Sequence, residues 1–210
     1  GFRGDIFSTP ATRDLAVLIM EDSARIQQRD ADYLARKAKK RGERFDWKPL
    51  YGPEDVDAAA EQFVSISYRR GFSPMPGVQA QFFDAGHILG SATVHLTVTD
   101  SAGKHVRVGF SGDLGRFGTA IIRDPQPMPA VDYLVLESTY GDRLHGPSVD
   151  AVGRLEEVVN RTVRRGGKVI IPAFAIERTQ EIVYYLHMLA LENRIPDVPI
   201  WIDSPMAISA

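Results

Sequence analysis

Residues 84–116 read DAGHILGSATVHLTVTDSAGKHVRVGFSGDLGR. Apolar and polar residues alternate over residues 93–99 and again over 104–110, and residues 100–103 between them are typical of a turn. This pattern predicts a β-hairpin. Because paired antiparallel strands share their ends, His87, just before the first strand, and Asp113, just after the second, are expected at the same edge of a sheet.

An imidazole and a carboxylate on glycine-flanked loops suit a metal site, because both bind zinc and the glycines let a substrate approach the backbone. The pattern alone more often indicates a turn histidine whose ring is hydrogen-bonded, and that alternative stays open. Asp84 also has two interpretations of equal weight. Its side chain either holds the His87 loop or belongs to an ordinary turn.

Three segments carry a family resemblance: GHILGSA at 86–92, SGDLGR at 111–116 and LESTYG at 136–141. In this order they closely resemble the metallo-β-lactamase-fold nucleases of the β-CASP group. That group includes the pre-mRNA 3′-end processing endonuclease and its bacterial and archaeal relatives. The similarity continues into PAFAIERTQE at 172–181 and IDSPMA at 202–207, so it covers nearly the whole chain.

The resemblance implies an α/β fold with two domains. Residues 1–141 would form part of the metallo-β-lactamase αββα sandwich, and residues 142–210 would begin a β-CASP domain with a parallel sheet. The second part of the chain supports this expectation, because helical patterns alternate with short apolar runs. We predict helices over 149–165 and 177–192 and strands over 168–171 and 200–202.

The remaining elements are predicted from local pattern. Phe2 to Ser8 is expected to be a strand, and Thr9-Pro10 is a typical helix start that precedes an amphipathic helix to Gln27. We expect a second helix over 53–63. Further strands are predicted over 78–83 and 131–136, the latter leading to Glu137, and the proline-rich residues 122–129 between them are expected to be a loop.

The resemblance also implies roles for site residues. Asp113 would bridge two metal ions and His87 would bind one of them. Glu137 would be catalytic, either orienting an imidazole or relaying a proton, with a strand-end acid that caps the following turn as the alternative. His145 has an active-site role or is a surface turn residue, and the two are equally weighted.

Two more positions are expected to bind substrate. Residues 173–180 look like a loop entering a helix, whose free amides form a potential anion site. Arg178 in its first turn would contact a phosphate, with pairing to Glu181 or Glu177 as an equal alternative. Ser204 follows the strand predicted over 200–202 and is expected to line the same cleft.

Parts of the family's metal site are missing from this chain. The family carries a His-x-His-x-Asp-His motif upstream and further histidine motifs downstream, whereas the five histidines here stand at 87, 95, 105, 145 and 187. We therefore expect a fragment of a larger enzyme, which on its own binds metal weakly and is inactive. A degenerate relative without metals is the alternative.

The amino-acid composition restricts which metal ligands and which cellular compartment are expected. The chain has 210 residues, a net charge of −2 and no cysteine, so a disulfide framework and a thiolate metal site are excluded and a cytoplasmic protein is expected. Oxygen and nitrogen ligands suit zinc, with manganese as the alternative. No apolar run approaches a membrane span. The basic run 36–44 is interpreted as a solvated helix end rather than a phosphate-binding patch.

We expect the parent protein to be a metal-dependent hydrolase that cleaves RNA phosphodiester bonds with water activated by two zinc ions. Single-stranded RNA is the expected partner, with DNA as the nearest alternative substrate, and a homodimer is left open. A non-catalytic RNA-binding or scaffold relative and a small-ester metallo-hydrolase are the rival functions. Whether cleavage is internal or terminal is not decided by the sequence.

Overall fold

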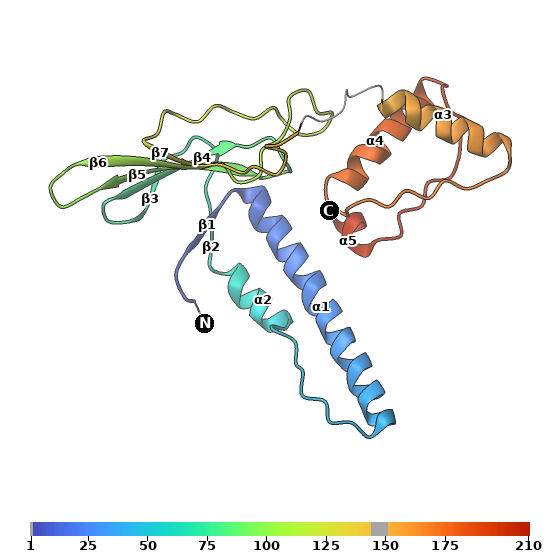
Figure 1. Cartoon of the computed structure of the whole chain (residues 1–210), viewed down its shortest axis with the longest axis horizontal. Coiled ribbons are helices and arrows are strands. Elements are labelled where there is room, and N and C mark those ends of the chain that lie inside the picture. The colour runs from blue at the N-terminus through green and yellow to red at the C-terminus, as the bar shows by residue number, and fades with distance from the viewer. Residues whose placement is uncertain (1, 144–150) are drawn as a thin grey trace.

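The computed structural model describes residues 2–143 and 151–210 and contains a five-stranded mixed β-sheet, at the upper left of Figure 1. Its strand order is β3-β4-β5-β6-β7. The strands are β3 (Phe72–Met75), β4 (Val78–Asp84), β5 (Ala92–Thr99), β6 (His105–Phe110) and β7 (Tyr133–Val135). Neighbouring strands are antiparallel, except that β7 runs parallel to β6.

The predicted hairpin is confirmed as β5 and β6, which pair from Val94 opposite Phe110 to Thr99 opposite His105. The Asp100 carboxylate closes the turn, because Oδ1 accepts hydrogen bonds of 2.9 Å from the amides of residues 102 and 104. At the opposite end of the hairpin, residues 85–91 precede β5 and residues 111–116 follow β6. Both loops lie at one sheet edge, as expected.

A helical arm extends from the sheet (Figure 1). Helix α1 (Pro10–Arg41) follows β1 (Ile6–Ser8), and α2 (Pro53–Ala60) precedes β2 (Phe63–Ser65), which pairs in parallel with β1. β2 and β3 were not predicted, and Phe63 begins a strand rather than ending a helix. Neither α1, with its 32 residues, nor another helix in the described ranges has an apolar stretch long enough for a membrane crossing.

Helix α1 continues 14 residues beyond the predicted end at Gln27 and ends at Gly42, which has a φ of 68°. The reason is a second packing pattern. Ala24, Ala31 and Ala38 recur every seven residues and are all buried, so they form one stripe along the helix. The chain returns along α1 after Gly42, and the Gln27 side chain accepts a 2.9 Å hydrogen bond from the Leu50 amide.

The C-terminal part contains α3 (Ala151–Arg164), α4 (Arg178–Leu191) and α5 (Pro205–Ser209). A small hydrophobic core joins α3 to α4 and is formed by Val159, Leu186, Leu189 and Ile195. This cluster lies entirely within the second predicted domain. The domain boundary at residues 141 and 142 stays a prediction.

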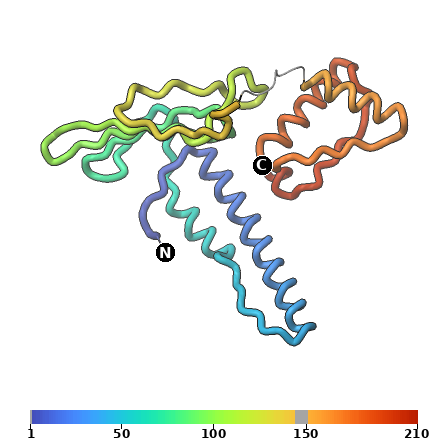
Figure 2. Tube along the Cα trace, in the orientation of Figure 1, coloured from blue at the N-terminus to red at the C-terminus, as the bar shows by residue number. Residues whose placement is uncertain are grey.

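The strands predicted over 168–171 and 200–202 are wrong for the described chain. Neither segment is a strand, so the second part has no parallel sheet among the described residues. Figure 2 shows the chain running between the C-terminal helices in long uncoiled stretches. A strand needs a neighbour to pair its backbone, and neither segment pairs with a described strand. Ile170 and Trp201 are 88% and 86% exposed, which shows how little packs on them.

Candidate metal centre

The His87 loop is held by side chains that bind its backbone. Asp84 Oδ1 accepts a 2.9 Å hydrogen bond from the Gly86 amide, and Ser91 Oγ accepts bonds of 3.1 and 3.2 Å from the amides of His87 and Ile88. Asp84 is buried. Of the two interpretations of Asp84, the structure therefore supports the one in which it holds the loop.

Tyr68 also holds the His87 loop, through a hydrogen bond to its last residue. Its hydroxyl donates a 2.8 Å hydrogen bond to the Ser91 carbonyl oxygen. Burial raises the pKa of Tyr68 to about 12, with the Asp84 carboxylate adding to the effect. The phenol therefore keeps its proton at neutral pH and remains a donor.

The start of α1 is fastened to the end of this loop. Thr9 and Thr12 both donate their hydroxyls to the Gly90 carbonyl oxygen, at 2.8 and 2.7 Å. Thr9 is also the helix N-cap, because its Oγ1 accepts the Thr12 amide at 3.2 Å. A β-carbon at Gly90 would lie 2.5 Å from the Thr12 nitrogen, so glycine is required for this contact.

Asp113 lies opposite His87 on the second loop. His87 Nε2 and Asp113 Oδ2 are 3.9 Å apart, which is too long for a hydrogen bond. Two metal–ligand bonds of about 2.0–2.2 Å span at most about 4.4 Å, so the gap can hold one ion between the two atoms. The Asp113 side chain is 72% exposed and accessible to substrate.

Glu137 reaches the Asp113 loop from the end of β7. Its Oε1 accepts a 2.6 Å hydrogen bond from the Leu114 amide, and its own amide donates to Ser111 Oγ at 3.0 Å. The Leu114 amide holds the pKa of the Glu137 carboxyl below its usual range, aided by Thr139 and by His87. Glu137 is therefore ionised at neutral pH, and it lies close enough to His87 for the imidazole to contribute to this shift.

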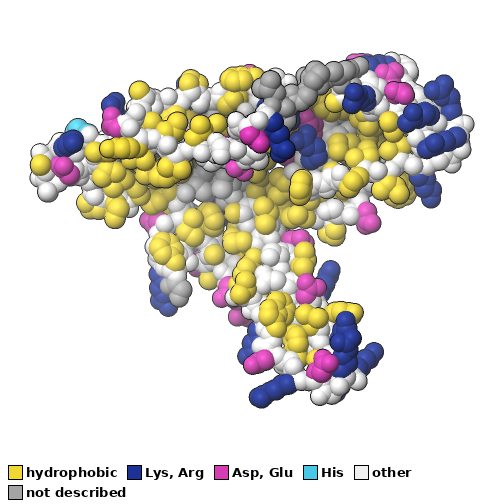
Figure 3. Space-filling model, viewed as in Figure 1, with side chains coloured by type: hydrophobic (Ala, Val, Ile, Leu, Met, Phe, Trp, Pro, Cys, Tyr) yellow, Lys and Arg dark blue, Asp and Glu magenta, His cyan; other side chains and the backbone are white. Residues whose placement is uncertain are grey.

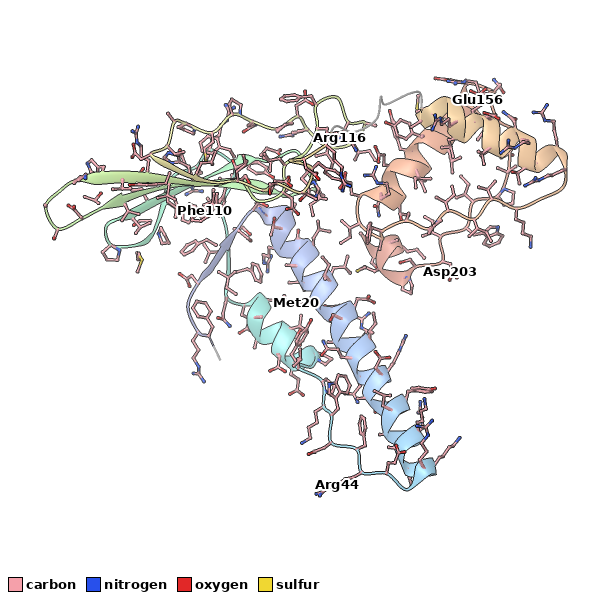
Figure 4. All side chains as sticks on the ribbon, viewed as in Figure 1. Met20, Arg44, Phe110, Arg116, Glu156 and Asp203 are labelled. Atoms are coloured by element: carbon pink, nitrogen blue, oxygen red, sulfur yellow. The ribbon has the colours of Figure 1, made fainter. Side chains whose placement is uncertain are left out.

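Glu177 lies within electrostatic reach of His87, whereas the sequence analysis named it only as a possible partner of Arg178. Its φ of 69° and ψ of −62° are those of a strained γ-turn, which the Arg178 amide closes by donating to the Ile176 carbonyl at 2.9 Å. Burial raises the pKa of its carboxyl, while the charges of Arg178, His87 and Arg116 oppose that shift. Figure 4 shows Arg116 at the end of the sheet that faces the C-terminal helices.

The other predicted substrate residues are engaged within the chain. Arg178 pairs with Glu181, and the amides of Arg178 and Thr179 bond to the carbonyls of Ile176 and Phe174. Those two amides are not free, so the predicted anion site at this helix start is wrong for them. Ser204 Oγ accepts the Ala207 amide at 3.2 Å and is the N-cap of α5. His145 lies outside the described residues.

The donor set fits a metal ion only in part. His87 and Asp113 supply one nitrogen and one carboxylate, which suits zinc or manganese. Among residues 2–143 and 151–210, no group of three or more histidine, aspartate or glutamate side chains could enclose an ion. Within the described ranges, His87 and Asp113 are therefore too few to enclose an ion by themselves.

Known proteins resemble this chain along nearly its full length. Ribonuclease TTHA0252 of Thermus thermophilus is 34% identical over 207 residues, which cover 99% of this chain and 42% of the ribonuclease. Transcription termination factor FttA of Pyrococcus horikoshii is 35% identical over 205 residues, 96% of this chain and 29% of the factor. Cleavage and polyadenylation specificity factor subunit 3 of Dictyostelium discoideum is 29% identical over 210 residues, 98% of this chain and 24% of that subunit.

These matches agree with the family resemblance of the sequence motifs. The chain spans less than half the length of each of the three relatives. No protein-family model matches it. The relatives share the β-CASP architecture, and the mixed α/β fold with its His87 and Asp113 loops is consistent with part of that architecture. Over nearly its whole length, the chain is similar to proteins of the β-CASP family of the metallo-β-lactamase fold.

Proposed function

We propose that the full-length protein is a metal-dependent hydrolase that cleaves RNA phosphodiester bonds. The observation that carries this proposal is the convergence of His87, Asp113 and an ionised Glu137 at one sheet edge. The names of the relatives support RNA as the substrate, because one is a ribonuclease and another a cleavage and polyadenylation factor subunit.

We propose the following roles for the residues of the site. His87 and Asp113 would hold divalent ions, which when bound would supply acidified water and neutralise charge on the phosphate oxygens. Zinc is the proposed metal, with two ions per site. Glu137, ionised and held by the Leu114 amide, would accept a proton or orient the group that donates one to the leaving oxygen.

We extend the proposal to the substrate cleft and the setting. Arg178 and Ser204 would line the path of single-stranded RNA, and His145 would have a catalytic role. For Arg178 this requires the guanidinium to leave Glu181, whose side chain is only 18% exposed. A cytoplasmic location and a homodimer belong to the proposal as well.

Cleavage by Asp113→Asn tests the nuclease proposal. The full-length protein is incubated with an end-labelled single-stranded RNA and zinc, and its metal content is measured in parallel. The variant is expected to lose cleavage by at least about 100-fold, because the removed charge is a proposed metal ligand. The matched control is Asp57→Asn on the exposed face of α2, which should keep full activity.

The same experiment separates the rival functions. Metal-free protein that still binds RNA would replace the nuclease with a non-catalytic RNA-binding relative. Metal-loaded protein that spares RNA but hydrolyses a small ester would replace it with an ester hydrolase. Equal cleavage by wild type and Asp113→Asn would remove Asp113 from the site.

A further inference from the structure

The far end of α1 carries an excess of positive charge. Residues 36–48 hold seven cationic side chains against two carboxylates, a net charge of +5 in a chain whose total is −2. We call this segment the arm tip. Its cations are Arg36, Lys37, Lys39, Lys40, Arg41, Arg44 and Lys48.

None of these seven cations forms an ion pair with a carboxylate in the described part of the chain. All seven residues are exposed. The helix dipole accounts for Lys39, Lys40 and Arg41 in the last turn, but it does not account for the charges before and after that turn. Figure 3 shows cationic side chains gathered at the lower end of the arm, away from the sheet.

Helix geometry places part of this charge on one face. At 100° per residue, Arg36, Lys37, Lys40 and Arg41 lie within about 140° of one another, on the side opposite the buried Ala31 and Ala38. Tyr33 lies on the same face, is 57% exposed, and has Lys37 Nζ 6.0 Å from its ring centre. Trp47, just beyond the helix, is 43% exposed.

Proteins that bind single-stranded nucleic acid combine cationic side chains with exposed aromatic rings, and the arm tip has both. The cations neutralise phosphates and release counterions, and the rings stack on bases. We propose that the arm tip is a second RNA-binding site, outside the metal centre, for the part of a single strand that extends beyond the cut. The proposal rests on the proposed function, because it assigns the arm to the same substrate.

The distance between the arm tip and the metal centre determines how long an RNA must be to contact both. Helix α1 begins where Thr9 and Thr12 bind Gly90, beside the His87 loop. A rise of about 1.5 Å per residue puts Arg36 roughly 40 Å from that start. At about 3.4 Å per nucleotide for a stacked strand, an RNA needs roughly 12 nucleotides to reach from the centre to the tip.

Equilibrium binding tests the arm without relying on cleavage. Fluorescence anisotropy of a 30-nucleotide single-stranded RNA is followed with the full-length protein in chelator, over a series of salt concentrations. The test variant changes Lys37, Lys40 and Arg41 to Gln, which keeps helix propensity. The matched control changes Arg3, Arg70 and Lys104 to Gln, removing the same charge from exposed positions outside α1.

The test variant is expected to bind the RNA about tenfold more weakly, with a log–log salt slope reduced by about 2, because each lost phosphate contact on a single strand removes about 0.7. The control should keep both values. In cleavage assays, the test variant should raise KM for the 30-nucleotide RNA and leave an 8-nucleotide RNA unchanged.

Several outcomes would overturn the arm-tip site. Unchanged RNA binding by the test variant would do so, as would equal losses in test and control variants. Loss of binding to vesicles of anionic phospholipid, with RNA binding kept, would assign the charge to a membrane surface instead. If RNA binding falls as expected while Asp113→Asn cleaves like wild type, the arm stands and the proposed catalytic site fails.

Discussion

Gly115 lies against Gly86 so closely that a β-carbon at position 115 would stand 1.4 Å from the Gly86 carbonyl oxygen. The Gly115 amide also donates a 2.8 Å hydrogen bond to the neighbouring Ala85 carbonyl. These contacts join the loop that carries His87 to the loop that carries Asp113. The separation of the two proposed ligands is therefore set by backbone packing that excludes any side chain.

Gly115→Ala is expected to force the two loops apart and to destabilise the protein by about 3 kcal/mol, as overpacking of a closed contact does. Metal affinity should fall as well, because the 3.9 Å spacing of His87 and Asp113 depends on this contact. Urea unfolding and zinc titration check both effects. Gly71→Ala is the control, since its β-carbon meets nothing within 4 Å, and a similar loss there would refute the explanation.

Asp84→Ala removes the hydrogen bond to the Gly86 amide and should cost about 1–2 kcal/mol, because the amide loses its partner in a buried place. Asp100→Ala removes the analogous bonds in the β5–β6 turn, at the far end of the hairpin. Both variants should lose stability, but only Asp84→Ala should lower metal affinity in isothermal titration. Equal metal affinities would separate Asp84 from the site.

Glu137→Gln should weaken the dependence of stability on acid. The pKa of Glu137 is lower in the folded protein than in the unfolded chain, chiefly through the Leu114 amide. Its ionised form therefore stabilises the fold above the unfolded pKa, and that contribution is lost as pH falls through the folded pKa. Denaturant midpoints of metal-free protein at pH 6 and pH 3 should differ less in the variant. An unchanged difference would contradict the proposed bond.

Glu177→Gly should be more stable than Glu177→Ala by about 1 kcal/mol. Glycine adopts the positive φ without backbone strain, whereas alanine at this position remains strained. The same pair of substitutions at Glu61 should rank in the opposite order, since its φ is −66°. Thermal unfolding of the four variants gives the comparison. If alanine ranks above glycine at both positions, Glu177 is not strained.

The hairpin and the loops around His87, Asp113 and Glu137 were predictable, because alternation and motif order specify them locally. The full length of α1 was not, since its continuation depends on Ala31 and Ala38, whose spacing of seven carries a weak apolar signal. Glu177 was missed for a related reason. Its importance lies in a backbone angle and in its approach to the His87 charge across the fold, and no local pattern encodes either.

The strands predicted over 168–171 and 200–202 show that local sequence can also predict elements that do not form. Apolar runs such as Val169–Ile171 indicate a tendency to pair, but pairing itself requires a neighbouring strand. The sequence predicted either a phosphate or a nearby glutamate as the partner of Arg178. The structure pairs Arg178 with Glu181, and this choice depends on the three-dimensional arrangement. Long-range contacts decide these cases.

The two threonine bonds to Gly90 give α1 a mechanical property. The helix is clamped at one end to the loop that carries His87, and its opposite end lies about 45 Å away along the axis. A transverse pull on that distant end produces a torque at the clamp that grows with the length of the helix. Tension in an RNA strand bound at that end would therefore act on the peptide of Gly90, three residues from the proposed metal ligand His87.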